Sequence, residues 1–259
     1  MSTRMLIPHE HGAWAQLGMP MVTTLIIVPN RLAAGLLAGS IIAVFLAFEP
    51  FAVVIGKRGA RIQREDGARA RLRLVQLGFL GAFLFLGWLY DNLESLELLV
   101  TFVPGLVLGA LFALSFWKFG ERALTSEVFG GVALAATTWP LARTGGLDSA
   151  QSVAMTLVWC LGFLAIDVAV DRCIKRPKDQ QGPMMRWGFV FGGALVGLGI
   201  YYRQATAYAP FAVALTPLLF AALALALRPP PVKAIKTVGW TLALSSTATS
   251  VALIWFLLK

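Results

Sequence analysis

Apolar residues along this chain are grouped into long runs that short polar stretches separate. Apolar runs near 20 residues long predict helices that cross a membrane. We expect nine of them, over residues 12–29, 32–56, 72–90, 98–117, 127–142, 151–171, 186–203, 209–227 and 235–258. The fourth and fifth are the weakest, because both carry Gly and polar residues and the fifth is short. The expected fold class is therefore all-α, a polytopic transmembrane bundle of about nine helices.

The composition agrees with this pattern. Of the 259 residues, 58% are apolar and 14% are charged, whereas soluble domains are near one half apolar and one quarter charged. Nine spans leave no room for a soluble domain of about 100 residues, so residues 1–259 are expected to form a single integral membrane domain. These figures exclude a soluble enzyme, a nucleic-acid binder, a coiled coil and a disordered protein. Two cysteines are too few for a disulfide framework, and both are expected to be reduced.

The positive charge predicts an orientation in the membrane. When Lys and Arg are sorted by alternating connections, 18 of the 22 fall on one side. By the positive-inside rule, that side and the N-terminus are cytoplasmic, and the C-terminus is outside. No clear cleavage site follows the first apolar run, which we interpret as a retained helix.

Four acids fall inside or at the ends of the expected spans. Ionisable groups in a membrane are expensive, so Glu49, Glu127, Asp167 and Asp171 are candidate catalytic residues by default. All four lie toward the cytoplasmic ends of their spans. The alternative is that each acid pairs with a nearby Arg or Lys and only fixes helix packing; for Glu127, a negative charge at a helix N-terminus is favourable in itself.

Asp167 and Asp171 are spaced i, i+4, which places both carboxylates on one helical face. Such a pair needs a basic neighbour, water or a cation. A hard cation such as Mg²⁺ suits paired carboxylates together with a substrate phosphate, so Asp167 and Asp171 are candidate metal ligands. A solvated helix end is the alternative.

The stretch from Lys57 to Arg73 is a strongly basic loop between expected helices. The default role of these basic residues is to keep the loop on the cytoplasmic side of the membrane and to contact anionic lipid headgroups. The functional alternative is a clamp for a phosphorylated or carboxylated amphiphile, because Arg binds such groups bidentately. The candidate substrate-binding residues are Arg58, Arg61, Arg122, Arg172 and Trp14.

The segment Pro8-His9-Glu10-His11-Gly12-Ala13-Trp14 holds both histidines of the chain. On a helix His9 and His11 point apart, whereas in an extended segment they share a side, so a metal or haem site requires a non-helical segment. General acid–base chemistry or headgroup binding is a second possibility. The third is a structural cap of the first helix, with Trp14 in the aromatic belt.

This segment resembles the N-terminal signature of the YwiC-like family of bacterial membrane proteins, in which His-Gly-Ala-Trp opens the first helix. A second block, from Arg122 through Glu127-Val128-Phe129-Gly130-Gly131, resembles the family's Arg…Glu-x-x-Gly segment. The resemblance implies a multi-pass protein of the inner (cytoplasmic) membrane and brings no biochemical activity with it.

The layout is also distantly similar to the UbiA superfamily of intramembrane prenyltransferases, which have nine helices and active-site loops after the second and sixth. There, two Asp-rich motifs hold Mg²⁺ against an isoprenoid diphosphate. Asp167-x-x-x-Asp171 sits where the second motif would be, whereas Glu49-Pro50-Phe51 and a basic stretch stand where the first would be.

The sequence thus leads to the hypothesis of a UbiA-like bundle that binds or modifies an isoprenoid, quinone or other lipid at a cavity on the cytoplasmic side. As an enzyme it would be a transferase, with Mg²⁺ as a possible cofactor. The alternatives are a transporter or permease, which predicts helix-breaking or ionisable residues near the midplane, and a non-catalytic haem- or respiration-related accessory subunit.

Overall fold

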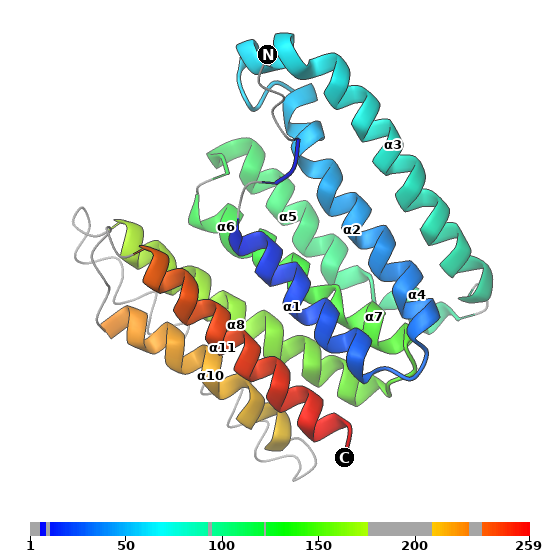
Figure 1. The fold of residues 1–259 in the computed structure, drawn as a ribbon, viewed down its shortest axis with the longest axis vertical. Coiled ribbons are helices and arrows are strands. Elements are labelled where there is room, and N and C mark those ends of the chain that lie inside the picture. The colour runs from blue at the N-terminus through cyan, green and yellow to red at the C-terminus, as the bar shows by residue number, and fades with distance from the viewer. Residues whose placement is uncertain (1–5, 9–10, 93–94, 122, 176–208, 228–234) are drawn as a thin grey trace.

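The computed structural model describes residues 6–8, 11–92, 95–121, 123–175, 209–227 and 235–259. Over these residues the fold is all-α, as predicted (Figure 1). The helices are α1 (His11–Ile27), α2 (Arg31–Val54), α3 (Ala60–Asn92), α4 (Leu96–Val100), α5 (Val103–Phe119), α6 (Leu124–Ala136), α7 (Thr138–Thr144), α8 (Ser149–Lys175), α10 (Ala209–Leu227) and α11 (Ile235–Leu257).

Six stretches of the described chain are helical, long and apolar enough to cross a membrane, and α1 is a shorter apolar helix. The protein is therefore a multi-pass membrane protein. The six stretches are Arg31–Val54, Ala60–Asn92, Leu96–Phe119, Ser149–Asp171, Ala209–Ala226 and Val238–Leu257. The predicted span 186–203 lies outside the described residues.

Most predicted spans agree with a helix to within a few residues, and 209–227 has the bounds of α10. The prediction was wrong at the start of α3, which begins at Ala60 rather than near residue 72. Most of the expected basic loop is thus the first turns of α3, and only residues 55–59 connect it to α2. Arg, Gln, Glu and Ala all favour helix. The segment is mostly polar, however, so it does not belong to an apolar run and was not predicted as helix.

Two predicted spans are interrupted. The run 98–117 is divided between α4 and α5, and the run 127–142 between α6 and α7. Pro104 stands in the first turn of α5, where its missing N–H costs nothing. Pro140 cannot donate to the carbonyl of Ala136, the last residue of α6, so the chain bends at Thr137.

The bundle is built around α8. Met155, Trp159 and Phe163 of α8 are almost fully buried, and they pack with Leu215 and Leu218 of α10 in one core cluster. A second cluster joins α1, α2, α3 and α7 around the buried indole of Trp88, whose Nε1 donates to Thr144 Oγ1 at 3.1 Å. α3 lies at the edge of the bundle and packs on α2 (Figure 1).

The helices alternate in direction, so their ends gather at two ends of the bundle. The ends of α2, α5, α8 and α10 and the starts of α3, α6 and α11 lie along the upper left of Figure 1. We call this the basic end, because it carries Lys57, Arg58, Lys118 and the arginines of α3.

Candidate functional site

The acid junction is a polar contact where α1, α6 and α8 meet. Gln16 of α1 donates from Nε2 to Oδ1 of Asp167 on α8 at 2.6 Å. Gly131 of α6 lies directly against this pair: a Cβ added to Gly131 would stand 2.5 Å from Asp167 Oδ2 and 2.6 Å from Gln16 Nε2. The missing side chain at position 131 therefore makes room for the contact, which a larger residue would disrupt.

Asp167 keeps one oxygen without a hydrogen-bond partner. Its Oδ2 atom is screened from solvent and accepts no hydrogen bond in the described part of the chain. Glu127, one helical turn before Gly131 on α6, is close enough for its carboxylate to act electrostatically on Asp167. A buried acceptor without a donor costs roughly 1–3 kcal/mol, so Oδ2 is suited to accept a hydrogen bond from a ligand.

Asp171 follows Asp167 by one turn of α8, as the spacing predicted, and is buried. Among the described residues, no group of three or more His, Cys, Asp and Glu side chains is arranged to hold a metal ion. One Asp167 oxygen also accepts from an amide N–H, which a cation would have to replace. A Mg²⁺ site at Asp167 and Asp171 would need further ligands from outside the described residues, and it stays a prediction.

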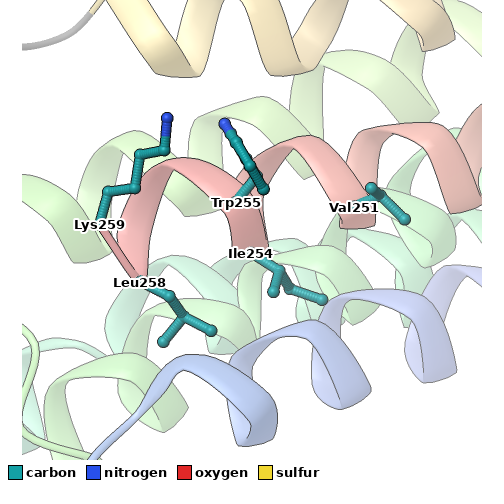
Figure 2. Close-up of a pocket in the computed structure, with 5 residues that line it drawn as sticks. All are labelled: Val251, Ile254, Trp255, Leu258 and Lys259. Atoms are coloured by element: carbon teal, nitrogen blue, oxygen red, sulfur yellow. The ribbon is translucent and has the colours of Figure 1, made fainter.

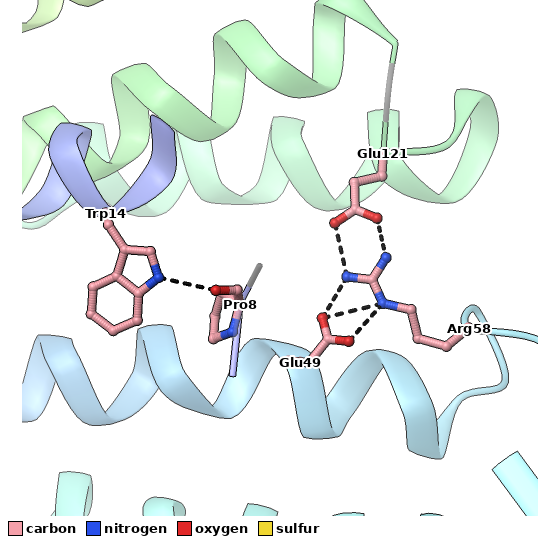
Figure 3. Close-up of polar contacts among 5 residues, drawn as sticks. All are labelled: Pro8, Trp14, Glu49, Arg58 and Glu121. Atoms are coloured by element: carbon pink, nitrogen blue, oxygen red, sulfur yellow. Dashed lines mark hydrogen bonds and ion pairs between the residues drawn. The ribbon is translucent and has the colours of Figure 1, made fainter. Parts of the chain in front are cut away.

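The arginine bridge is a second polar cluster at the basic end, formed by Glu49, Arg58 and Glu121 (Figure 3). Arg58 Nε donates to Glu49 Oε1 at 3.0 Å, and Arg58 Nη2 donates to Glu121 Oε1 at 3.0 Å. Further bonds run from Nη2 to Glu49 and from Nη1 to Glu121. The guanidinium thus holds the two carboxylates side by side, one of them on the 2% exposed side chain of Glu49.

This environment favours the charged form of Arg58. Burial alone lowers the pKa of the guanidinium, but its hydrogen bonds with Glu121 and Glu49 outweigh that effect and raise the pKa above its ordinary value. Arg58 was predicted to clamp an anionic ligand and Glu49 to act as a base or Arg partner. The structure shows Glu49 as an Arg partner, and a clamp at Arg58 would have to displace one of two carboxylates.

Lys57 binds residues 55–59, the connection between α2 and α3, to the end of α5. Its Nζ donates to the carbonyl of Trp117 at 3.2 Å and lies 4.5 Å from the centroid of the Trp117 ring. Together, Lys57 and Arg58 tie residues 55–59 to α5 and to the residues that precede α6. The first two basic residues of the predicted loop therefore have structural partners.

Trp14 holds the N-terminal segment against α1. Its Nε1 donates to the carbonyl of Pro8 at 3.0 Å (Figure 3). Its ring packs edge to face with the ring of Phe45 on α2, and the two ring centroids are 4.9 Å apart. Leu6 is buried with Val53 and Ala70 where α2 and α3 meet. This arrangement agrees with the capping interpretation of the segment.

The other predicted site residues are more weakly placed. Arg61 is exposed on α3 and pairs with Glu65 at 2.8 Å. Residues His9 and Arg122 lie outside the described residues, as do the side chains of His11 and Arg172. Their proposed roles in proton transfer, haem or metal ligation and anion binding stay predictions.

Three residues of these clusters were not predicted as site residues: Gln16, Glu121 and Gly131. Gln16 could have been found as a lone amide inside an apolar run, and Gly131 was noted only as part of a motif. Glu121 lies between two predicted spans, where an acid draws no attention.

An open apolar groove of about 460 Å³ lies at the other end of the bundle, along the last turns of α11 (Figure 2). It is lined by Val251, Ile254, Trp255, Leu258 and Lys259. Lys259 Nζ stands 4.3 Å from the centroid of the Trp255 ring, which is typical of side chains at a membrane surface. None of the lining residues belongs to the acid junction or the arginine bridge.

Comparison with known proteins identifies the family. The model of the family described as YwiC-like protein matches residues 7–143, more than half of the chain. The chain belongs to the YwiC-like family. The match contains Gln16 and Gly131 of the acid junction and the whole arginine bridge, whereas Asp167 lies beyond it.

No curated protein and no solved structure matches the YwiC-like chain. The comparisons therefore support membership of the family and give no support to the distant similarity with intramembrane prenyltransferases. They also name no substrate.

Proposed function

We propose that this YwiC-like protein binds a membrane amphiphile, an isoprenoid, quinone or other lipid, with its polar head at the acid junction and its tail between apolar helix walls. The observation that supports the proposal is the depth of the buried polar groups. Ligands of this kind combine a long apolar part with one polar end, and a site for them needs a few polar groups near the surface of an apolar domain.

The depth follows from the positions along the helices. Asp167 lies four residues before the end of its span at Asp171, and Glu49 five residues before the end of its span at Val54. At a rise of about 1.5 Å per residue, both are about 6–8 Å from the basic end of a hydrocarbon core about 30 Å thick. This is the level at which the head of an amphiphile meets its tail.

The chemistry of the junction favours a head that donates a hydrogen bond. Asp167 Oδ2 has no hydrogen-bond donor among the described residues, and the nearby carboxylate of Glu127 adds negative charge beside it. A hydroxyl or amine group fits such a site better than a phosphate does. Arginines at positions 122 and 172 are the predicted partners for an anionic group, since Arg58 already holds two carboxylates.

The enzymatic form of this proposal is a transferase that resembles the intramembrane prenyltransferases. It rests on the Asp167-x-x-x-Asp171 spacing and on the expected bundle of about nine helices. The missing first Asp-rich motif argues against Mg²⁺-assisted diphosphate departure of the usual kind.

A transporter is the second candidate, and one observation favours it. The bend between α6 and α7 follows the 13 residues of α6, about 20 Å from the start of that helix. Thr138 Oγ1 and Trp139 Nε1, directly after the bend, are buried polar atoms without a partner in the described residues. Interrupted helices with free polar groups are typical of transporter sites.

Native mass spectrometry with lipid extraction tests the main proposal. The variant Asp167→Asn preserves an acceptor for Gln16 but replaces the free Oδ2 acceptor by a donor. We expect it to weaken retention of the co-purified amphiphile roughly 10- to 100-fold, because a buried polar group left without its partner costs about 1–3 kcal/mol.

Asp148→Asn is the matched control. Asp148 directly precedes the first residue of α8, at the opposite end of that helix from Asp167, and its Oδ1 accepts a hydrogen bond from the backbone N–H of Gln151. This control should retain the amphiphile. Equal retention in both variants, or wild-type protein without any amphiphile, would contradict the proposal. Solute flux into liposomes that Asp167→Asn abolishes would favour the transporter instead.

A further inference from the structure

α3 is longer than a membrane is thick. Its 33 residues span about 50 Å at 1.5 Å per residue, against a hydrocarbon core of about 30 Å. The first four turns carry five arginines, and apolar residues dominate the rest. These arginines are Arg61, Arg64, Arg69, Arg71 and Arg73. The helix therefore extends past the bilayer at its basic end.

The pairing of α3 with α2 gives the depth of each arginine. Ser40 Oγ of α2 donates to the carbonyl of Gly81 at 3.0 Å, and Val53 packs with Ala70 at the other end of the antiparallel pair. Ala70 is thus level with the last turn of α2, where that span ends. Arg71 and Arg73 stand at the boundary of the hydrocarbon core. Arg64, two turns earlier, is about 10 Å further out, at headgroup level.

Arg64 and Arg71 lie on the side of α3 that faces away from the bundle. Arg64 and Arg71 share a helical face because they are seven residues apart. Arg71 also begins a row of positions four residues apart, 71, 75, 79 and 83, which joins it to the exposed stripe formed by residues 72, 75, 79, 83 and 86. Arg73, two residues after Arg71, points to the other side of the helix. In that stripe Phe79 is 75% exposed and Phe83 is 74% exposed. The opposite face, with Gly67, Ala70, Gly81 and Trp88, is buried.

Three of these arginines have no acidic partner in the described part of the chain. Among the described residues, Arg64, Arg71 and Arg73 form no ion pair, whereas Arg61 pairs with Glu65. Arg64 donates from Nε only to the carbonyl of Ala60, at 3.3 Å. All three side chains are exposed. Their positive charge is thus available to a ligand.

We propose that this arginine face of α3, formed by Arg64 and Arg71 above the stripe from Leu72 to Leu86, is a binding site for an anionic phospholipid of the leaflet at the basic end. The phosphate group contacts the guanidinium groups, and the acyl chains lie along Val75, Phe79 and Phe83. An acidic soluble protein fits less well, because the apolar stripe continues directly below Arg71 into the hydrocarbon core. The site is separate from the acid junction, since α3 packs on α2 at the edge of the bundle.

The test measures which lipids remain bound. The full-length protein is reconstituted in nanodiscs of phosphatidylcholine with one fifth phosphatidylglycerol, and the ratio of the two lipids retained after transfer to detergent is measured by native mass spectrometry. Each basic residue near an anionic surface contributes about 1 kcal/mol, which corresponds to about fivefold in affinity. We expect Arg64→Gln with Arg71→Gln to lower phosphatidylglycerol enrichment by roughly 25-fold.

Three controls separate this site from other effects. Arg31→Gln removes an exposed arginine at the other end of α2 and should leave the enrichment unchanged. Arg71→Lys preserves the charge and should retain most of it, which also shows that the helix folds with a changed residue at this position. Asp167→Asn should leave the enrichment unchanged, so a failure of the proposed amphiphile site would not affect this result.

The expected pattern is loss of enrichment only in the glutamine variants of α3, and a weaker effect in high salt. Equal lipid ratios in the wild type and the Arg64→Gln, Arg71→Gln variant would overturn the proposal. An equal loss in Arg31→Gln would overturn it too, because it would show a response to total charge.

Discussion

Replacing Gly131 by alanine would place a methyl carbon where the Gln16–Asp167 contact now lies. The new Cβ would be 2.5 Å from Asp167 Oδ2, 2.6 Å from Gln16 Nε2 and 2.9 Å from Gln16 Cδ. Non-bonded heavy atoms do not approach a Cβ this closely, so one or both side chains must move. The hydrogen bond of 2.6 Å between them is then lost.

Three contributions decide how much Gly131→Ala changes the free energy of unfolding. Overpacking a well-filled interior costs roughly 1–3 kcal/mol, and an interhelical hydrogen bond in a membrane protein contributes about 0.6–2 kcal/mol. Alanine recovers about 1 kcal/mol through its higher helix propensity. We therefore expect Gly131→Ala to lower the free energy of unfolding by roughly 1–3 kcal/mol.

Unfolding by SDS in mixed micelles, followed by circular dichroism, measures this difference. Gly109→Ala in α5 is the matched control, because a Cβ there would have no atom within 4 Å, and it should be neutral or slightly stabilising. In a Gln16→Ala background, Gly131→Ala should cost about 1 kcal/mol less, as expected for residues in contact. Equal stability of the two Gly→Ala variants, or no dependence on Gln16, would refute the reasoning.

Three further substitutions test the arginine bridge and the end of α5. Arg58→Ala leaves the buried carboxylate of Glu49 without its cation and should lower the free energy of unfolding by about 3–5 kcal/mol. Arg58→Lys should be intermediate, because an ammonium group cannot hold two carboxylates bidentately; equal stability of Arg58→Lys and wild type in the same SDS titration would argue against the bridge. Gly120 ends α5 with φ of 86° and ψ of 170°, a region that only glycine adopts readily, so Gly120→Ala should cost about 1–3 kcal/mol. Gly109→Ala again serves as the comparison, since neither position has an atom within 4 Å of an added Cβ, and matching unfolding midpoints for the two variants would show that the backbone conformation is not strained.

Hydrophobic runs were enough to predict the class of this protein and the bounds of several helices. They succeeded where apolar length alone decides the outcome, as in α10. They failed at Ala60, because the exposed first turns of α3 are held by helix propensity and by contacts of Ala70 with Val53 rather than by an apolar run. They also could not show the bends at Pro104 and Pro140, since Pro is tolerated within membrane helices such as α2.

The candidate site was predicted in part. Asp167 and Glu49 were found because a charge inside an apolar run is conspicuous, and the alternative of an Arg partner for Glu49 is what the structure shows. The hydrogen-bond partners of these residues could not be predicted from the sequence, because Gln16 is 151 residues from Asp167 and Glu121 is 63 residues from Arg58. A single sequence carries no signal of such pairings. A neutral amide and an acid in a connection also have no local feature that marks them as functional.

The arginine bridge has a consequence for how the chain is made. Arg58 leaves the ribosome only nine residues after Glu49, whereas Glu121 follows 63 residues behind Arg58. The buried acid of α2 therefore gains its counter-charge while the hairpin of α2 and α3 is inserted, before α5 and α6 exist. Glu121 arrives later and fastens the finished hairpin to them. Loss of Arg58 should therefore reduce the efficiency with which the α2–α3 hairpin is inserted into the membrane. Loss of Glu121 should leave insertion unchanged and weaken only the packing of the hairpin on α5 and α6 in the mature protein.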